Sequence, residues 1–476
     1  MKKIALFLIF VLSINTGSAQ KKTKEIDSLM NLFKQNAHFN GTILVAENNQ
    51  VIYKNGFGYA NMEWNVPNTT NTRFRLASLG KQFTALLIMQ LVEEGKIKLE
   101  GKICDYLPEY PATSGKIITI HQLLTHTSGI PNYHIIPDYD ANQGRAYTRS
   151  EYMDLFKNQK LMFKPGTQYY YTNLGYFVLG CIAEKVSGKS YTQLIKQKIF
   201  DPAGMTESNT EEEKQVIPNL AYGYNFIYTG YEPARFRHPS QVFGAGHIIT
   251  TVEDFFKYDQ ALHNYKLLSE KYQKLTNTVY KNGYGYGWNM SYYPKSKNDS
   301  VTLASHDGGT YGFASVAYRF IEDNKLIVAF SNSSPYDMYV VARAVGRILY
   351  NREKIFPKRS YVEEFAITTN KANADSAVGQ YYYLKKNQSE IYELDGVEFN
   401  LLGYNYLRKN MFKEAIAVFK LNVEAYPNFG APYDSLAEAY MLTDQKDLAI
   451  KNYKKALELD PNNSNAKVML KKLNEK

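Results

Sequence analysis

The hydrophobic and polar positions along the chain predict two pairs of adjacent strands, far apart in the sequence. Residues 41–47 and 50–58 are predicted strands separated by Asn48-Asn49, a dipeptide typical of a β-hairpin. Further on, residues 313–320 and 325–332 form a second predicted pair with a short polar turn between them. We therefore expect antiparallel sheet at both ends of this region.

Helical spacing prevails between the two strand pairs. Hydrophobic residues recur every three or four positions up to Gly95, and again up to Gly188; glycine is common just after the end of a helix. The two faces comprise Phe83, Leu86, Leu87 and Leu91 in the first helix, and Leu174, Phe177, Val178, Cys181, Ile182 and Val186 in the second. A third helix is predicted from about residue 335 to 350. This arrangement predicts an α/β (α+β) domain in which helices pack on one antiparallel sheet.

Residues of the same kind recur in the tail at an interval of 34 positions. The pairs are Phe399 and Tyr433, Leu402 and Leu436, Gly403 and Ala437, Tyr406 and Tyr440, Ala415 and Ala449, Phe419 and Tyr453, and Pro427 and Pro461. This is the period of the tetratricopeptide repeat, a unit of two helices, so two repeats are expected. Because two repeats bury little surface, we expect either an extra helix within residues 372–386 or docking of the repeats on the preceding domain.

The first residues have the pattern of a secretory signal peptide. Lys2 and Lys3 precede a hydrophobic run over residues 4–14, and Gly17-Ser18-Ala19 offers small residues for cleavage. The run is too short to span a hydrocarbon core of about 30 Å, and no later stretch predicts a transmembrane segment. We expect a signal peptide at 1–19, a domain at 20–356, a linker at 357–395 and repeats at 396–476. The mature protein is expected to be exported, either periplasmic or extracellular.

Charge, cysteines and histidines indicate which partners, disulfides and cofactors to expect. The formal net charge is +10, without an arginine-rich arm or a clustered basic helix, which argues against a nucleic-acid partner. The two cysteines are Cys104 and Cys181, and the place of Cys181 on a hydrophobic helical face predicts a buried free thiol rather than a disulfide. The histidines are not spaced as metal ligands, so we expect neither a metal nor another cofactor.

Ser78-Leu79-Gly80-Lys81 is the first candidate for chemistry. The following helix would place Ser78 at its N-terminus, and positions i and i+3 share a helical face, so the Lys81 amine can reach the Ser78 hydroxyl. A serine needs an adjacent base to become a nucleophile, and burial lowers the pKa of a lysine toward that role. The spacing is not specific, because Ser464 and Lys467 in the tail share it.

Tyr171-Thr172-Asn173 is the second candidate. It directly precedes a hydrophobic helix, which would fix its position. The same pattern at Tyr53-Lys54-Asn55, Tyr59-Ala60-Asn61 and Tyr280-Lys281-Asn282 lacks this context. The Tyr171 phenol could transfer protons near Lys81, and the Asn173 amide could bind Lys81 or a substrate carbonyl. The alternative is a packed tyrosine followed by a helix-capping asparagine.

His306-Asp307-Gly308-Gly309 is the third candidate. The two glycines would let a substrate approach the backbone, and a main-chain N–H there could form an oxyanion hole with that of Ser78. The alternative is a glycine turn with a surface histidine.

These three motifs, in this order, resemble those of serine β-lactamases and penicillin-binding proteins, especially the class C-like branch. Four further segments, over residues 123–129, 243–246, 250–254 and 284–288, are similar to the same family, and the resemblance spans about residues 40–332. It implies a sheet domain beside an all-helical lobe. It also implies an acyl-enzyme on Ser78, proton transfer by Lys81 and Tyr171, and an oxyanion held by the Ser78 and Gly309 N–H groups. For His126 it implies a structural hydrogen bond.

One departure from the family affects the expected substrate. Many β-lactamases carry Lys-Thr-Gly where this chain has His306-Asp307-Gly308, and a histidine is only partly charged near neutral pH. The resemblance therefore leaves the small-molecule or peptide substrate open between a D-amino-acid peptide, a small ester or amide, and a β-lactam, and it favours an esterase or D-amino-acid peptidase over an efficient β-lactamase. The alternative is a slow or inactive penicillin-binding-type sensor that recruits a protein partner through the repeats.

Overall fold

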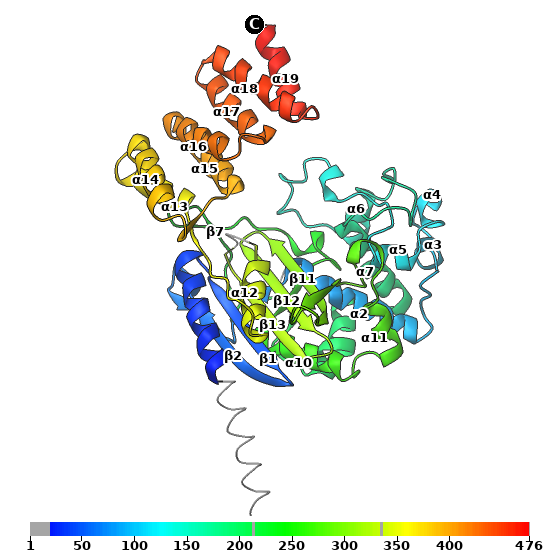
Figure 1. The fold of residues 1–476 in the computed structure, drawn as a ribbon. Helices are drawn as coiled ribbons and strands as arrows, with labels where there is room; N and C mark the ends of the chain where they lie inside the picture. Colours follow the sequence, from blue (N-terminus) through cyan, green and yellow to red (C-terminus); the bar gives the residue numbers. More distant parts are fainter. Residues whose placement is uncertain (1–19, 212–214, 334–336, 476) are drawn as a thin grey trace, which may run out of the picture. The chain divides into compact units, whose positions relative to one another are not determined.

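The computed structural model describes residues 20–211, 215–333 and 337–475 (Figure 1). The predicted signal peptide at 1–19 lies outside these residues. The chain forms two compact units. The first contains the chain up to Asn225 together with Pro233–Phe356, and the second contains Phe226–Glu232 together with Pro357–Lys476. The second unit thus begins where the sequence placed a linker, and it also takes up a short segment from within the first domain.

The first unit is built on a six-stranded antiparallel sheet, which confirms the predicted architecture. The strand order is β10-β11-β12-β13-β1-β2. The strands are β1 (Gly41–Glu47), β2 (Gln50–Phe57), β10 (Asn289–Pro294), β11 (Ser300–Thr310), β12 (Phe313–Phe320) and β13 (Lys325–Ser331). The two predicted hairpins meet where β1 pairs with β13, from Gly41 opposite Ser331 to Glu47 opposite Lys325. Strands β10 and β11 were not predicted.

The two faces of this sheet carry separate hydrophobic cores, because neighbouring residues of a strand point to opposite sides. Ile43 and Val45 pack with the helix at residues 20–36 and with α12 (Tyr339–Leu349). Leu44 and Ala46 belong to the other core, with α2 (Lys81–Glu93) and α10 (Val252–His263). The sheet is therefore covered by helices on both faces.

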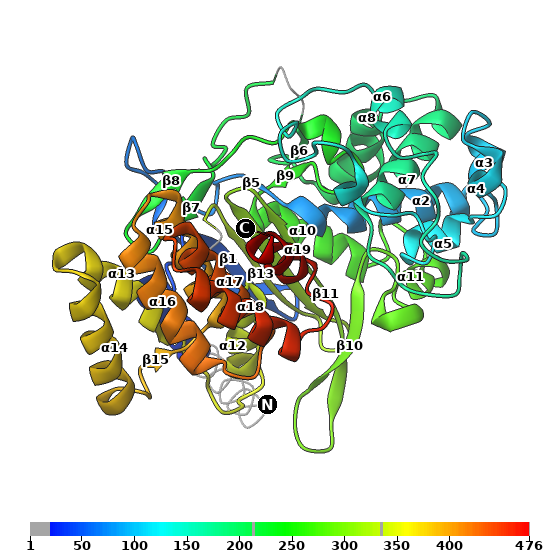
Figure 2. The ribbon, with the colours of Figure 1, turned by 90° about the horizontal axis from the view of Figure 1, so that it is seen from above.

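A helical lobe completes the first unit. Both ribbon views show its helices gathered to one side, away from β1 and β2 (Figures 1 and 2). They include α3 (Ile103–Tyr106), α4 (Ala112–Gly115), α5 (Ile120–Leu124), α6 (Arg149–Asp154), α7 (Asn173–Ser187) and α8 (Tyr191–Ile195). The second predicted helix is α7, and Gly188, with a φ of 69°, ends it in the left-handed conformation.

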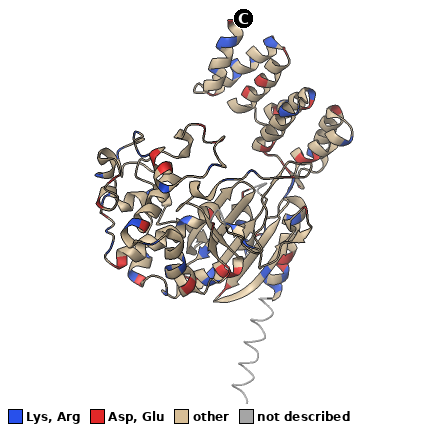
Figure 3. Cartoon of the chain, turned by 180° about the vertical axis from the view of Figure 1, so that it is seen from behind, with Lys and Arg blue, Asp and Glu red and all other residues tan. Residues whose placement is uncertain are grey.

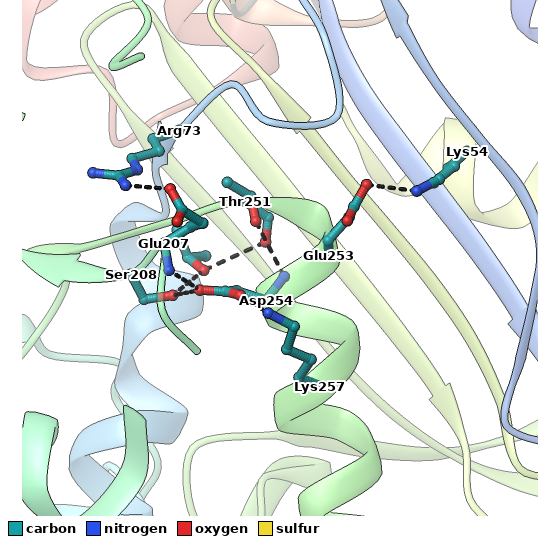
Figure 4. Close-up of polar contacts among 9 residues, drawn as sticks. Lys54, Arg73, Glu207, Ser208, Thr251, Glu253, Asp254 and Lys257 are labelled. Atoms are coloured by element: carbon teal, nitrogen blue, oxygen red, sulfur yellow. Dashed lines mark hydrogen bonds and ion pairs between the residues drawn. The ribbon is translucent and has the colours of Figure 1, made fainter. Parts of the chain in front are cut away.

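The buried carboxylate of Asp254 connects the start of α10 to residues 207 and 208 (Figure 4). The Asp254 carboxylate accepts hydrogen bonds from the Glu207 N–H at 2.7 Å and the Ser208 hydroxyl at 2.8 Å, and it pairs with Lys257 at 2.7 Å. Thr251 caps the helix by accepting a bond from the Asp254 N–H. The resemblance of residues 250–254 to the family is thus explained by a structural role, the capping and anchoring of α10.

The second unit contains three consecutive helix pairs and a final single helix. They are α13 (Tyr361–Lys371), α14 (Ala374–Asn387), α15 (Gly396–Arg408), α16 (Phe412–Ala425), α17 (Gly430–Leu442), α18 (Lys446–Leu459) and α19 (Ser464–Asn474). The 34-residue interval maps α15 and α16 onto α17 and α18, as predicted. The segment at 357–395, expected to be a linker with a possible extra helix within 372–386, contains α14 at that place and α13 before it. This helix pair joins the same hydrophobic core and so supplies the extra burial that two repeats lack.

A segment from the first domain also enters the core of the second unit. It links β7 (Tyr224–Phe226) to β8 (Tyr231–Pro233). Tyr228, only 7% exposed, packs in the core that contains Phe399, and its hydroxyl lies 3.4 Å from the Glu398 carbonyl. Nothing in the hydrophobic pattern indicated this.

Charges and cysteines follow the sequence-based expectations. Basic and acidic residues are interspersed over both units (Figure 3). Cys104 and Cys181 are both free, and Cys181 is buried. Among the described residues, no helix is long and hydrophobic enough to cross a membrane.

Candidate active site

Ser78 lies in a tight turn between a strand and a buried helix. Strand β5 (Phe74–Arg75) pairs with β9 (Ile248–Thr250) and leads into a 3₁₀ turn at Ala77–Gly80, and α2 begins at Lys81. Ala77 has a φ of 49°, a conformation that non-glycine residues adopt at a cost. This turn places the Ser78 hydroxyl at the start of α2.

Lys81 is fully buried and directly contacts Ser78. Its Nζ lies 2.9 Å from the Ser78 Oγ, 2.7 Å from the Asn173 Oδ1 and 3.0 Å from the Ala245 carbonyl oxygen. Its side chain is 0% exposed. Burial lowers the pKa of Lys81 well below its usual value, against a smaller opposing effect of Asp307.

The partners of Lys81 define a route for the Ser78 proton. A neutral amine has two N–H groups and one lone pair. The Asn173 and Ala245 oxygens can only accept, so they take the two N–H groups and leave the lone pair to the Ser78 hydroxyl. The geometry and the lowered pKa therefore both favour Lys81 as the base that activates Ser78.

Tyr171 lies on the other side of this pair. The Lys81 Nζ is 4.8 Å from its ring centroid, and its hydroxyl is out of contact with solvent. Burial raises the pKa of Tyr171 well above its usual value, and nearby Ser78 offsets only part of that rise. The phenol therefore keeps its proton in the resting site, where it is better suited to donate than to act as the first base.

The cap of α7 fixes Tyr171 and Asn173. Thr172 caps the helix, and its N–H donates to His126 Nδ1 at 3.2 Å. Burial lowers the pKa of His126 well below its usual value, so this ring is neutral and structural. The Asn173 side chain binds Lys81, one of the two contacts that the sequence suggested.

The backbone of the third motif differs from the glycine turn of the alternative interpretation. Residues 306–309 are not a turn but part of β11, paired with β12 from His306 opposite Ala317 to Gly309 opposite Ala314. The glycines hid this strand, because glycine is rare in strand interiors.

His306 is not among the residues that line the cavity containing Ser78. It is 2% exposed, and its Nε2 lies 3.0 Å from the Tyr284 hydroxyl. Burial lowers the pKa of His306 to about 4, so the ring is neutral near pH 7. The surface histidine of the alternative interpretation is wrong, and direct substrate binding by His306 is not what this position provides.

The two glycines have different surroundings. A Cβ on Gly308 would lie 2.0 Å from the Leu76 carbonyl oxygen and 2.9 Å from the Leu79 nitrogen, so β11 packs directly against the turn that carries Ser78. A Cβ on Gly309 would meet nothing within 4 Å. Gly308 therefore has a packing role, and Gly309 faces open space.

A cavity of about 650 Å³ brings four of the predicted residues together: Ser78, Tyr171, Asn173 and Gly309. Lys81 contacts two of them from beneath the cavity floor. His306 and Gly308 lie outside the lining and support it.

Two functional groups escaped the sequence analysis. The Ala245 carbonyl holds Lys81, and Tyr284 holds His306. Both lie in segments noticed only for their family similarity, at residues 243–246 and 284–288. A backbone carbonyl cannot be recognised from residue type, so only the glycine-rich segment at 243–246 indicated the one of Ala245. Among the described residues, no group of three or more His, Cys, Asp or Glu side chains could hold a metal ion.

The sequence matches the β-lactamase family over residues 26–351, a range that contains the whole site. The chain belongs to the β-lactamase family. A second match, to the tetratricopeptide repeat, covers residues 431–463 within the tail. Both agree with the resemblance and the repeat found in the sequence.

Relatives and solved structures support this placement. Penicillin-binding protein 4* of Bacillus subtilis (strain 168) is 32% identical over 364 residues, 71% of this chain and 79% of that protein. Teichoic acid D-alanine hydrolase of Staphylococcus aureus (strain MRSA252) is 32% identical over 311 residues, 63% of this chain and 72% of that protein. A penicillin-binding protein structure from Bacillus halodurans has a TM-score of 0.60 at 27% identity, covering 67% of this chain and 99% of that one. A class C β-lactamase structure has a TM-score of 0.61 at 26% identity, covering 70% and 97%. The chain is thus a β-lactamase-family serine hydrolase.

Proposed function

We propose that the protein cleaves an ester, amide or D-amino-acid peptide through an acyl-enzyme on Ser78. The observation that carries this proposal is the contact of the fully buried Lys81 amine with the Ser78 hydroxyl at 2.9 Å, at the floor of an open cavity. Among the described residues, no carboxylate is hydrogen-bonded to the Lys81 amine. Burying its charged form would therefore be costly, which favours the neutral amine.

The first half of the reaction makes the acyl-enzyme. The Ser78 Oγ attacks the substrate carbonyl carbon while its proton passes to the Lys81 lone pair. The N–H groups of Ser78 and Gly309 stabilise the resulting oxyanion, a role proposed from the family resemblance. Tyr171 then gives its proton to the leaving group and recovers one from Lys81, so the carbonyl–leaving-group bond breaks without a net change in charge.

The second half returns the enzyme. A water molecule gives a proton to the same relay and attacks the acyl carbon, and the bond to the Ser78 Oγ breaks as the serine recovers its proton. Two names among the relatives, a penicillin-binding protein and a teichoic acid D-alanine hydrolase, support a D-alanyl ester or peptide as the acyl donor. The neutral, buried His306 favours these over efficient β-lactam hydrolysis.

Labelling with a neutral fluorophosphonate tests the nucleophile. We expect the label on the peptide that contains Ser78 and its loss in Ser78→Ala. Ser464→Ala is the matched control, because Ser464 also precedes a lysine by three residues but is exposed. Label on another serine, or full turnover of D-alanyl esters by Ser78→Ala, would refute the mechanism.

Two further proposals concern location and partners. The amino-terminal pattern supports export to the periplasm or beyond, and the tetratricopeptide tail supports recruitment of an envelope protein. Crosslinking of the whole Ser78→Ala protein in cells should capture a partner as well as the wild type does. A partner captured only by the active protein would instead indicate a substrate.

A further inference from the structure

The described residues that line the cavity containing Ser78 carry an excess of positive charge. Its charged lining residues are Arg75, Glu211, Arg235 and Arg237. Glu211 is already paired, since its Oε1 accepts from Arg75 Nε at 2.9 Å and Nη2 at 2.7 Å. Among the described residues, no carboxylate oxygen lies within 4 Å of a guanidinium nitrogen of Arg235 or Arg237. Within the described part of the chain, two arginines therefore face this cavity without a counter-ion.

Arg237 is held in a fixed position. Its Nε donates to the Gln143 Oε1 at 2.6 Å, and its Nη2 donates to the Tyr139 hydroxyl at 2.7 Å. Gln143 is only 4% exposed, so it is a rigid acceptor. These two bonds use two of the five N–H groups of the guanidinium, and three remain for a ligand.

Aromatic rings replace the missing carboxylate around Arg237. Its guanidinium carbon lies 5.4 to 5.6 Å from the ring centroids of Tyr133, Tyr139 and Tyr311. Such rings stabilise a cation without neutralising it. A half-buried guanidinium, oriented by two hydrogen bonds and short of an anion, is suited to bind two oxygens of a carboxylate or phosphate.

We propose that Arg237, assisted by the exposed Arg235, is a specificity-determining residue that binds an anionic group of the substrate outside the reacting carbonyl. This inference rests on the proposed acyl-enzyme function. Arg237 would also supply the positive charge that the third motif lacks, because His306 is neutral and buried. The anionic group is either a peptide carboxylate or the phosphate of a polyol phosphate ester.

Competition against fluorophosphonate labelling of the full-length protein tests this. One arm compares N-acetyl-D-alanyl-D-alanine with its C-terminal amide; the other compares D-alanyl-glycerol phosphate with D-alanyl-glycerol. In the wild type, the anionic member of at least one pair should protect Ser78 at a concentration about tenfold or more lower than its neutral partner. The arm that shows the difference identifies the carboxylate or the phosphate.

Variants assign the effect to Arg237. The ratio between charged and neutral competitors should fall to near one in Arg237→Gln and recover only in part in Arg237→Lys, which keeps the charge but loses the two-pronged donor. Arg145→Gln is the matched control, because Arg145 is an exposed arginine stacked on Tyr147 outside the cavity lining. Its ratio should equal that of the wild type.

The outcomes separate the two proposals. Equal protection by charged and neutral competitors in the wild type, or an unchanged ratio in Arg237→Gln, overturns the anion site while Ser78 labelling still stands. Failure of the wild type to label at Ser78 overturns the proposed function itself. Because each ratio is measured within one variant, a general loss of reactivity in Arg237→Gln cannot imitate the expected result.

Discussion

The chain contains the same four-residue spacing, Ser-x-x-Lys, in two very different surroundings. In the first unit, Ser78 precedes Lys81 in the turn that leads into α2, and the lysine is 0% exposed. In the tail, Ser464 begins α19 and both it and Lys467 are exposed. Helical geometry brings serine and lysine together in both places. Only burial removes the lysine from water and makes its neutral form accessible, so the surroundings rather than the motif create the base.

The largest difference between the two copies should appear when each lysine is removed. Lys81→Ala should slow acylation of Ser78 by about 10²–10⁴-fold, because the serine loses its proton acceptor. Lys467→Ala should leave the rate unchanged. Single-turnover acylation with a chromogenic D-alanyl ester measures both. A loss of less than about tenfold in Lys81→Ala would assign the base role to another group.

A smaller effect should follow from changing the charge next to Lys81. In the wild type, kcat/KM should rise with pH through the lowered pKa of Lys81, because only the neutral amine accepts the Ser78 proton. Asn173→Asp places a carboxylate where Oδ1 now lies 2.7 Å from the Lys81 Nζ, which raises the pKa of Lys81.

The acid limb of the pH profile should therefore move to higher pH, with a loss of about tenfold or more at neutral pH. The exposed Asn55 in the Tyr53-Lys54-Asn55 copy gives the control, Asn55→Asp, whose profile should match the wild type. A shift of the acid limb to lower pH in Asn173→Asp would contradict a neutral Lys81.

The packing of the catalytic turn gives a third, mainly structural prediction. Gly308→Ala should reduce the free energy of unfolding by about 1–3 kcal/mol, because its Cβ would overlap the Leu76 carbonyl. Gly309→Ala, with open space around it, should be nearly neutral in stability. Urea unfolding followed by tryptophan fluorescence measures both, and equal losses would show that β11 does not press on the turn.

The smallest effect is expected in the tail copy. Ser464→Ala should change the free energy of unfolding by no more than about 0.5 kcal/mol, as exposed substitutions usually do, and should leave esterase activity intact. Thermal unfolding and an ester assay test this together. A marked loss of activity would mean that exposure is a poor guide to function in this chain.

Much of the fold could be read from the sequence, because periodic patterns report burial. The hairpin at 41–58, the helix after Ser78 and the 34-residue interval all match the structure. Strand β11 was missed because Gly308 and Gly309 are poor strand formers. The place of Gly308 depends on its close approach to Leu76, a contact far away in sequence.

The site was predictable only in part, for a related reason. Ser78, Lys81, Tyr171 and Asn173 meet as the motif order implied, since their side chains carry the chemistry. The burial of His306 and the bond from Lys81 to the Ala245 carbonyl depend on tertiary packing, which the residue types alone do not encode.

The segment that carries Tyr228 has a consequence for the evolution of the protein. Tail repeats are often regarded as modules that recombination can add or exchange after a domain boundary such as residue 356. Here Tyr228, encoded well upstream, fills part of the hydrophobic interior formed by residues beyond that boundary. A foreign repeat array joined after residue 356 would have to accommodate this ring or leave it exposed to water, so catalytic domain and tail are expected to be inherited together.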